Sequence, residues 1–137
     1  MKRRFVLDAW AILAFLQKEE PAASEVKRMF EEGERKELDL YISLINLGEV
    51  YYRIGRVKGE DEAKGTLEEI LRLPITVLPV TWDSVFSAAS FKIRYLISYA
   101  DAFAAAAAEE LNAVLVTGDP DFDKLKGRIK IKKLTRE

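Results

Sequence analysis

The sequence predicts an α/β fold, in which a central parallel sheet of about five strands is flanked by helices in three layers. Short apolar and β-branched segments alternate along the chain with longer segments whose apolar residues have helical spacing. Strands that alternate with helices are joined by crossover connections, which place the strands parallel. The length of 137 residues and the hydrophobic fraction of 49% suit one compact domain. We therefore expect a single domain over residues 1–137.

The first half of the chain is expected to contain both strands and helices, separated by proline and glycine. Strands are predicted at residues 5–8 and 40–42, and helices at residues 9–17, 22–32, 43–54 and 61–73. Gly33 is expected to stop the second of these helices. A break at residues 55–59, which begin and end with glycine, is expected to separate the last two helices into a charged hairpin.

The second half of the chain is expected to continue the alternation. Strands are predicted at residues 75–80, 113–117 and 128–132, and helices at residues 81–95 and 99–111 and, briefly, after Pro120. The last strand alternates basic and apolar residues, which is typical of an edge strand whose lysines discourage pairing with another sheet.

The composition excludes several classes of protein. The chain has no cysteine and no histidine, so it can form neither a disulfide framework nor a thiolate metal site, and the commonest general base is missing. Its longest apolar runs are shorter than the roughly 20 residues that span a bilayer, so we expect a cytoplasmic protein with no membrane partner. The formal net charge of −1 means that a nucleic-acid partner would need local contacts or a bridging metal. Abundant Lys, Arg and Glu beside a single glutamine indicate heat adaptation.

Four acidic residues stand at positions that matter in such a fold. Ligands of an open parallel sheet bind beyond the carboxyl ends of its strands. Asp8 ends the first predicted strand, and Asp119 follows the predicted strand at residues 113–117. Glu49 lies on the helix that leaves the second strand, and Asp101 opens the helix before residues 113–117. The pattern therefore places Asp8 and Asp119 at one edge of the sheet and permits the other two to join them.

Each of these acids also has a structural explanation, which the sequence leaves open. Asp8 and Asp119 are both positioned to cap the helix that follows them, because each stands just before a predicted helix. Asp101 is the acidic member of a capping box that begins at Ser98. Glu49 lies near the apolar stripe of its helix, where Arg53 at i+4 offers an ion-pair partner.

If the acids converge, their mutual repulsion requires a bound cation. Two carboxylates 4 Å apart repel by about 4 kcal/mol at an effective dielectric constant near 20. Ligation by oxygen alone selects hard ions such as Mg²⁺ or Mn²⁺, which keep open positions that bind phosphate. Hydrolysis of a phosphodiester bond is the chemistry that such a site suits, and it does not need a histidine.

Several segments carry a resemblance to a known family. They are residues 6–8 followed by a helix, Ser43 with Glu49 six residues later, residues 99–106, and residues 115–122, and together they span almost the whole chain. With these segments the sequence resembles the PIN-domain family and, within it, the VapC-type toxins of bacterial and archaeal toxin–antitoxin pairs. The last two segments are the most specific.

The resemblance implies both a metal site and the residues that form it. The four acids Asp8, Glu49, Asp101 and Asp119 would form the catalytic site, with Asp8 and Asp101 as ligands of the principal Mg²⁺. The hydroxyls of Thr117 and Ser43 would support the site, and Asp121 would lie in a more distant position. Trp10 departs from the family pattern, because these toxins usually carry Ser or Asn two residues after the first Asp. We expect Trp10 to be a core residue, a stacking surface for a base, or a plug against the partner.

The resemblance also implies partners and a function. A VapC-type toxin would be a Mg²⁺-dependent endoribonuclease, form a homodimer, and be held inactive by a cognate antitoxin that covers its acidic groove. An RNA-processing PIN nuclease is the alternative with the same chemistry, and a PIN fold that serves only as a binding module is an alternative without it. A phosphoacceptor receiver domain is an alternative from another class, although it normally has an acidic doublet after the first strand where this chain has the lone Asp8.

Overall fold

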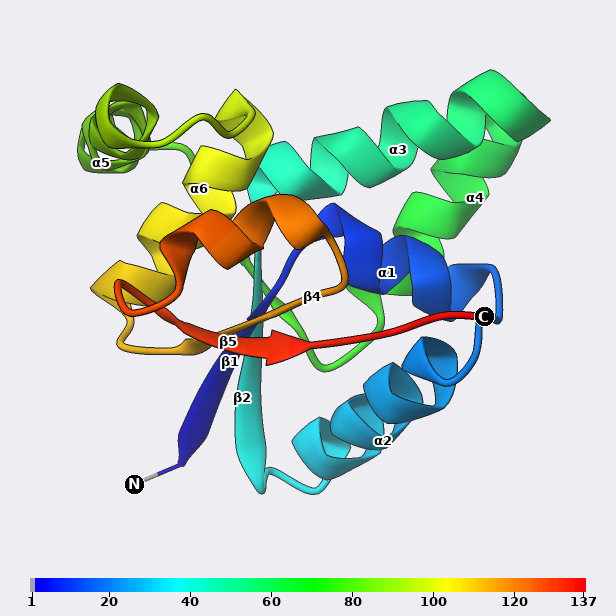
Figure 1. Cartoon of the computed structure of the whole chain (residues 1–137). Helices are drawn as coiled ribbons and strands as arrows, with labels where there is room; N and C mark the ends of the chain where they lie inside the picture. Colours follow the sequence, from blue (N-terminus) through cyan, green and yellow to red (C-terminus); the bar gives the residue numbers. More distant parts are fainter. Residues whose placement is uncertain (1) are drawn as a thin grey trace.

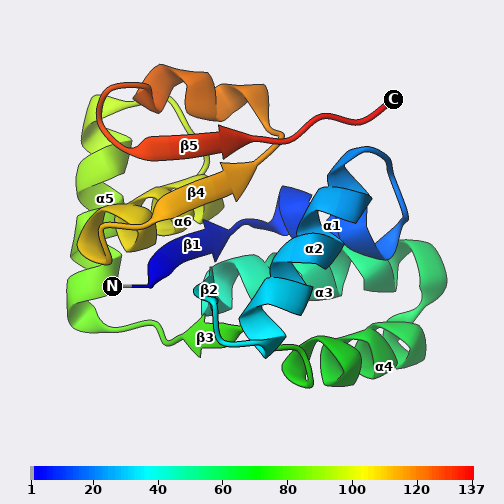
Figure 2. The same ribbon diagram turned by 90° about the horizontal axis from the view of Figure 1, so that it is seen from below.

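A computed structural model describes residues 2–137 and shows a five-stranded sheet with the strand order β3-β2-β1-β4-β5 (Figure 1). All four strand pairs are parallel, and β3 and β5 form opposite edges of the sheet (Figure 2). The strands are β1 Arg3–Leu7, β2 Leu38–Ser43, β3 Thr76–Leu78, β4 Val114–Thr117 and β5 Lys130–Lys133. The parallel sheet and the edge position of the last strand are therefore confirmed.

Helices cover both faces of the sheet. They are α1 Ala9–Leu16, α2 Ala22–Glu34, α3 Leu44–Lys58, α4 Glu60–Leu71, α5 Trp82–Arg94, α6 Tyr99–Glu110 and the short 3₁₀ helix η1 Pro120–Leu125. The buried residues of α1 to α4 pack in one core with one face of the sheet, whereas those of α5, α6 and η1 pack against the other. Within residues 2–137, none of these helices is long and apolar enough to cross a bilayer.

The central strand β1 is buried on both faces because its side chains alternate between the two cores. Phe5 and Leu7 pack in the core of α1 to α4, whereas Val6 packs in the core of α5 and α6. Val6 pairs in register with Tyr41 of β2 on one side and with Leu115 of β4 on the other. This explains why the strand reads as a continuous apolar run.

Several expected boundaries were wrong, chiefly at glycines. The third helix does not break at Gly55: α3 runs through this residue, which packs beside Ala63 of α4, and ends at Gly59, whose φ is 94°. Of Gly55 and Gly59, only Gly59 has the positive φ that favours glycine. Likewise, α2 passes through Gly33 and ends at Glu34. The predicted strand at residues 75–80 is shorter, because only residues 76–78 pair with β2.

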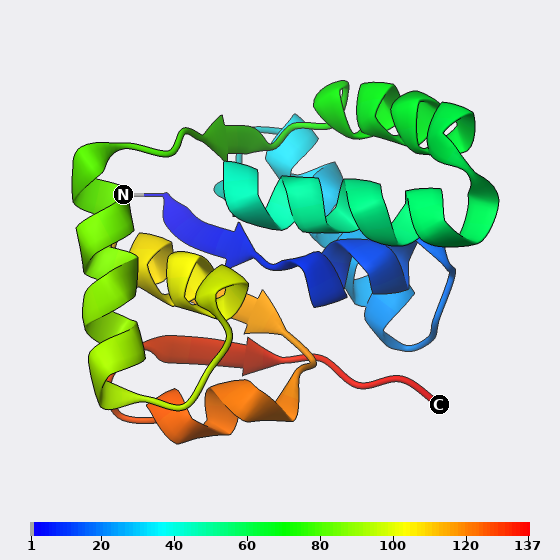
Figure 3. The ribbon, with the colours of Figure 1, turned by 90° about the horizontal axis from the view of Figure 1, so that it is seen from above.

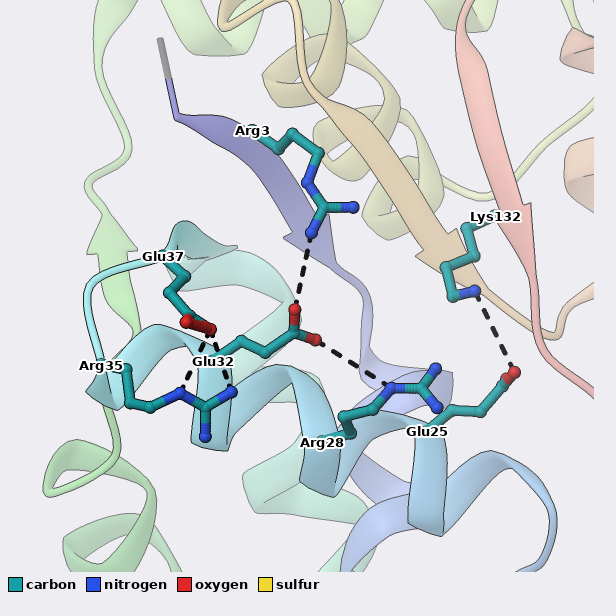
Figure 4. Close-up of polar contacts among 7 residues, drawn as sticks. All are labelled: Arg3, Glu25, Arg28, Glu32, Arg35, Glu37 and Lys132. Carbon is teal, nitrogen blue, oxygen red and sulfur yellow. Dashed lines mark hydrogen bonds and ion pairs between the residues drawn. The ribbon is translucent and has the colours of Figure 1, made fainter.

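Ion pairs connect the polar face of α2 with residues of the sheet (Figure 4). Glu32 lies 3.5 Å from Arg3 of β1 and 4.0 Å from Arg28 on its own helix, and Glu25 lies 4.0 Å from Lys132 of β5. These pairs are solvent-accessible, so each contributes about 0–1 kcal/mol to the free energy of unfolding near room temperature. The apolar residues on the buried face of α2 therefore contribute more to its packing against the sheet than these ion pairs do.

Candidate metal centre

The chain builds the sheet outward from the central strand β1, first to one side and then to the other. From β1 the chain proceeds to β2 and β3 on one side, whereas β4 and β5 lie on the other. This reversal is a topological switch point, beyond which ligands bind in open α/β sheets. Figure 3 shows the arrowheads of β1 and β4 pointing to the same side of the molecule, where α1 and η1 begin. Asp8 directly follows β1, and Asp119 is separated from the end of β4 by a single residue, Gly118.

Asp8 is a buried carboxylate at the N-terminus of α1, with 2% of its surface exposed. Its Oδ1 accepts a hydrogen bond from the Ala11 backbone N–H at 2.9 Å, and its Oδ2 accepts one from the Thr117 hydroxyl at 2.5 Å. Burial, together with smaller contributions from the charges of Asp101 and Asp119, raises the pKa of Asp8 to about 7, against the lowering effect of the two hydrogen bonds. The helix cap is confirmed, but capping alone does not require such deep burial of an acid.

Asp101 lies in the first turn of α6 and faces several of the other acids. The Ser98 hydroxyl accepts a hydrogen bond from the Asp101 backbone N–H at 3.1 Å, which caps the helix. Burial raises the pKa of Asp101 to about 6, with additional contributions from the negative charges of Asp119, Glu49 and Asp121. Asp101 is therefore the acid at the centre of the negative charge.

The turn after β4 brings two further acids to Asp101. The Asp119 backbone N–H donates to the Thr117 hydroxyl at 3.0 Å, and the Asp119 carboxylate accepts from the Asp121 backbone N–H at 2.9 Å. Carboxylate oxygens of Asp101, Asp119 and Asp121 all lie within 4.8 Å of one another. Asp121, which was expected in a more distant position, therefore lies within 4.8 Å of both Asp101 and Asp119.

Glu49 has both its structural partner and a place at the site. Its Oε2 accepts a hydrogen bond from Arg53 at 3.1 Å, as the i+4 spacing predicted. Glu49 is half-buried, and its charge contributes to the raised pKa of Asp101. The ion pair therefore explains how a carboxylate is tolerated there, while its position brings it to the other acids.

One cavity of about 440 Å³ joins these groups. All four acids singled out from the sequence line it, namely Asp8, Glu49, Asp101 and Asp119. The arginines that line it are Arg53, Arg56 and Arg136. The cavity therefore combines a concentrated negative charge with side chains that are suited to bind phosphate.

A buried asparagine that the sequence analysis did not single out connects two of the helices at the site. Asn46 is fully buried in the first turn of α3. Its Oδ1 accepts from the Ser43 hydroxyl at 2.6 Å, and its Nδ2 donates to the Ala100 carbonyl at 3.2 Å, one residue before Asp101. Ser43 thus contacts Asn46 rather than the acids, and it acts on the site through this link. A polar residue on the apolar side of a predicted helix was the signal for Asn46.

The side chain of Trp10, two residues after Asp8, packs against Gly118, the residue before Asp119. A Cβ atom added to Gly118 would overlap the ring atoms of Trp10, so the close approach requires glycine at this position. Trp10 packs against the main core and also lines the cavity. The guanidinium carbon of Arg136 lies 5.0 Å from the centroid of its ring. Gly118 and Arg136 both cover the indole, so it does not present the open stacking surface that one expectation assigned to it.

The donor set fits a hard divalent cation. All candidate ligand atoms are oxygens, and those of Asp101, Asp119 and Asp121 are close enough together to hold one ion. The raised pKa values of Asp8 and Asp101 show that the ionised acids are unfavourable without a compensating charge. A cation would supply that charge.

The fold and the site define a class of protein, namely parallel α/β domains that gather acidic side chains at the switch point of the sheet. The sequence model of the PIN domain matches residues 5–128, a range that includes all four acids. The chain belongs to the PIN domain family. The alternative of a receiver domain is therefore excluded. No curated protein sequence matches the chain.

Solved structures with a similar fold come from toxin–antitoxin systems. VapBC2 from Rickettsia felis, bound to a DNA fragment from its promoter, has a TM-score of 0.74 at 17% identity over 96% of this chain and 99% of that chain. DNA-bound VapBC from Salmonella typhimurium has a TM-score of 0.74 at 20% identity over 97% and 98%. VapC20 from Mycobacterium tuberculosis, a sarcin–ricin loop cleaving toxin, has a TM-score of 0.72 at 20% identity over 89% and 95%. At these identities the likeness shows the shared fold.

Proposed function

We propose that the chain is a metal-dependent endoribonuclease. The observation that carries the proposal is the convergence of four carboxylates from separate elements on one cavity, with Asp101 at the centre of the charge. Acids in a cleft whose pKa values are raised by burial and by neighbouring charges are typical of functional sites. Membership of the PIN domain family supports the same chemistry.

The residues have separate roles in this proposal. Asp8 and Asp101 would hold the cation, which is Mg²⁺ or Mn²⁺, and Glu49 and Asp119 would complete the site directly or through water. When bound, the cation makes hydroxide available near neutral pH and neutralises the phosphate oxygens. The Thr117 hydroxyl orients Asp8 and the turn that carries Asp119, because it donates to one and accepts from the other. Asp121 lies beside Asp101 and Asp119 and adds to the negative charge.

The direct test is cleavage of a defined RNA by the purified chain. We expect labelled single-stranded oligoribonucleotides to be cut in MgCl₂ or MnCl₂, and we expect EDTA to stop the reaction. Intact RNA at every metal and substrate tested, with the protein folded by circular dichroism, would contradict the proposal. A metal titration followed by calorimetry separates a nuclease from a PIN fold that only binds a partner, because the latter has no need of the ion.

We further propose that the nuclease is the cytoplasmic toxin of a toxin–antitoxin pair. Two of the similar structures are VapBC complexes and a third is a toxin that cleaves the sarcin–ricin loop. In this proposal a cognate antitoxin covers the acidic cavity and blocks access to the metal. Induced expression in a bacterial host should arrest growth, and coexpression of the antitoxin should restore it. Growth without arrest, together with RNA cleavage in vitro, would favour the RNA-processing alternative.

We also propose that the chain forms a homodimer through α5, which lies at the outer edge of the molecule (Figures 1 and 2). Trp82, Phe86 and Ile93 share one face of this helix and are 78%, 56% and 85% exposed. A two-fold axis perpendicular to α5 would align the two copies of this helix in opposite directions, so that Asp83 of each copy approaches Arg94 of the other. Light scattering should give a dimer for the wild type and a monomer for Trp82→Glu. A dimer in both would exclude this face.

Finally, we propose that the protein is heat-adapted. Its charged fraction of 33% forms networks, such as the one in which Glu32 contacts both Arg3 and Arg28. Networks of this kind stabilise more at high temperature, because the desolvation of charged groups becomes less unfavourable. We expect a melting temperature above the range of about 45–65 °C that is usual for mesophilic domains. A scanning calorimetry midpoint inside that range would contradict this.

A further inference from the structure

The cavity that holds the acids is also lined by an arginine from the end of the chain. Arg136 follows β5, and its backbone is fixed in place beside the start of α2. The Ala22 N–H donates to the Thr135 carbonyl at 3.0 Å, and the Glu137 N–H donates to the Glu20 carbonyl at 3.0 Å. The backbone at Arg136 is thereby held at both flanking residues.

The guanidinium of Arg136 is positioned by two contacts on its own side of the cavity. It lies over the Trp10 ring, with its central carbon 5.0 Å from the ring centroid, and its Nη1 donates to Glu19 at 3.0 Å. Among residues 2–137, Glu19 is the only carboxylate within 4.0 Å of this guanidinium. Arg136 therefore does not pair with Asp8 or Asp119, although all three line the same cavity. A side chain that served to plug the acidic site would be expected to form such a pair.

Arg56 repeats this arrangement on α3. Its guanidinium carbon lies 4.9 Å from the centroid of the Tyr52 ring, and both residues line the cavity. Within residues 2–137 no carboxylate lies within 4.0 Å of Arg56. In two views, α3 and the segment after β5 lie on either side of α1 (Figures 1 and 3). The two arginines thus line the same cavity from segments that lie on either side of α1.

We propose that Arg56 and Arg136 bind phosphates of an RNA strand that lies in the cavity beside the acid cluster. This inference rests on the nuclease function proposed above. An RNA strand is repelled by the carboxylates, so its neighbouring phosphates need cationic partners to hold the strand in the cavity. A guanidinium stacked on an aromatic ring is already ordered, and the N–H groups at its edge remain able to donate to phosphate oxygens. The two stacked pairs therefore act as positioning contacts for the substrate.

The contacts can be measured by equilibrium binding in the background of Asp101→Asn, which prevents cleavage. Fluorescence anisotropy of a labelled single-stranded oligoribonucleotide in MgCl₂ gives Kd at several salt concentrations. Arg136→Gln and Arg56→Gln should each raise Kd about tenfold, in keeping with the strength of charge-assisted hydrogen bonds. Each should also reduce the slope of log Kd against log salt by about 0.7, the value for one phosphate contact on a single strand.

Lys130 provides the matched control. It lies on β5 in the same part of the chain but does not line the acidic cavity, so Lys130→Gln removes the same charge elsewhere. Its Kd should stay within about twofold of the parent, because long-range charge effects are screened at physiological salt. Arg136→Lys keeps the positive charge but removes the planar guanidinium with its paired N–H donors. We expect its Kd to lie between those of the parent and Arg136→Gln. This variant also serves if Arg136→Gln fails to fold.

The outcomes separate this inference from the function on which it depends. If the wild type cleaves RNA and the glutamine variants bind as tightly as the parent, the phosphate contacts are wrong and the nuclease stands. Equal weakening by Lys130→Gln would also overturn the inference, since it would indicate a general charge effect. Faster cleavage by Arg136→Gln, in the chain with Asp101 intact, would overturn the inference by showing that the Arg136 side chain blocks the acidic site. If the wild type neither binds nor cuts RNA, the nuclease proposal fails and this inference fails with it.

Discussion

The Thr117 hydroxyl donates a hydrogen bond to the Asp8 carboxylate, which lies 109 positions earlier in the sequence. The same hydroxyl accepts the backbone N–H of Asp119 at 3.0 Å. One side chain at the end of β4 therefore orients an acid after β1 and the turn that carries a second acid. The bond to Asp8 joins the ends of β1 and β4, which pair in parallel, whereas the bond from Asp119 is local to the turn after β4.

Thr117→Val should test this link, because it replaces the hydroxyl with a methyl group of similar shape. Outer contacts of this kind typically change metal affinity or activity by about 10- to 100-fold. We expect a loss of this size in RNA cleavage, together with a higher Mg²⁺ concentration at half-maximal rate. Thr117→Ser should restore most of the activity. If Thr117→Val cuts RNA at the wild-type rate, the hydroxyl has no role in the site.

Replacing a single acid should abolish cleavage without unfolding the protein. Asp8→Asn and Asp101→Asn each remove one negative charge from the cluster and keep the shape of the side chain. We expect Mg²⁺-dependent cleavage to be lost in both, with melting temperatures within a few degrees of the wild type. Asp61→Asn, an exposed substitution in the first turn of α4, is the control and should remain active. Full activity in either cluster variant would defeat the assignment.

The raised pKa of Asp8 predicts how stability changes with pH in EDTA. In the folded state the pKa is about 7, compared with 3.8 for the ordinary group, so the folded protein binds the proton more tightly than the unfolded chain. The stabilising effect of protonated Asp8 is therefore complete below about pH 4 and is lost as the pH rises to about 7. The melting temperature of the wild type, compared with that of Asp8→Asn, should fall over this interval. A constant difference would show that the carboxyl is not perturbed.

Metal binding should show the opposite dependence on pH. The cation needs ionised carboxylates, so its binding displaces the protons that Asp8 and Asp101 hold at low pH. The affinity for Mg²⁺ should therefore rise as the pH increases through about 6 to 7, the pKa values of these two acids. Titration calorimetry in buffers of different ionisation enthalpy would detect the released protons. Affinity that is independent of pH over this range would contradict the proposed ligands.

Asn46 should be important for both stability and activity. Asn46→Ala removes the acceptor of the Ser43 hydroxyl and the amide that donates to the Ala100 carbonyl, both in a buried region, and such losses cost about 1–3 kcal/mol of the free energy of unfolding. It also frees the start of α6 from α3, so RNA cleavage should fall even at temperatures where the variant is folded. Urea unfolding and cleavage rates would measure the two effects. A variant with normal stability and activity would show that the link is dispensable.

The sequence was sufficient to predict the elements and the acids because both depend on local patterns. Alternating apolar segments predicted the five parallel strands, and position after a strand identified Asp8 and Asp119. Contacts between distant segments carry no local signal, and this is why the packing of Trp10 against Gly118 and the approach of Arg136 were not foreseen. The helix boundary expected at Gly55 was also wrong: α3 continues through this residue, which lies beside Ala63 of α4, another contact between separate segments.

The fit between Trp10 and Gly118 has a consequence for how this protein can vary in evolution. Any side chain at position 118 would collide with the indole, so glycine is obligatory there as long as position 10 is tryptophan. Where a relative has the smaller Ser or Asn at the equivalent of position 10, that restriction is lifted. The two positions should therefore be inherited as a pair, and a tryptophan at the first should be accompanied by glycine at the second in homologous sequences.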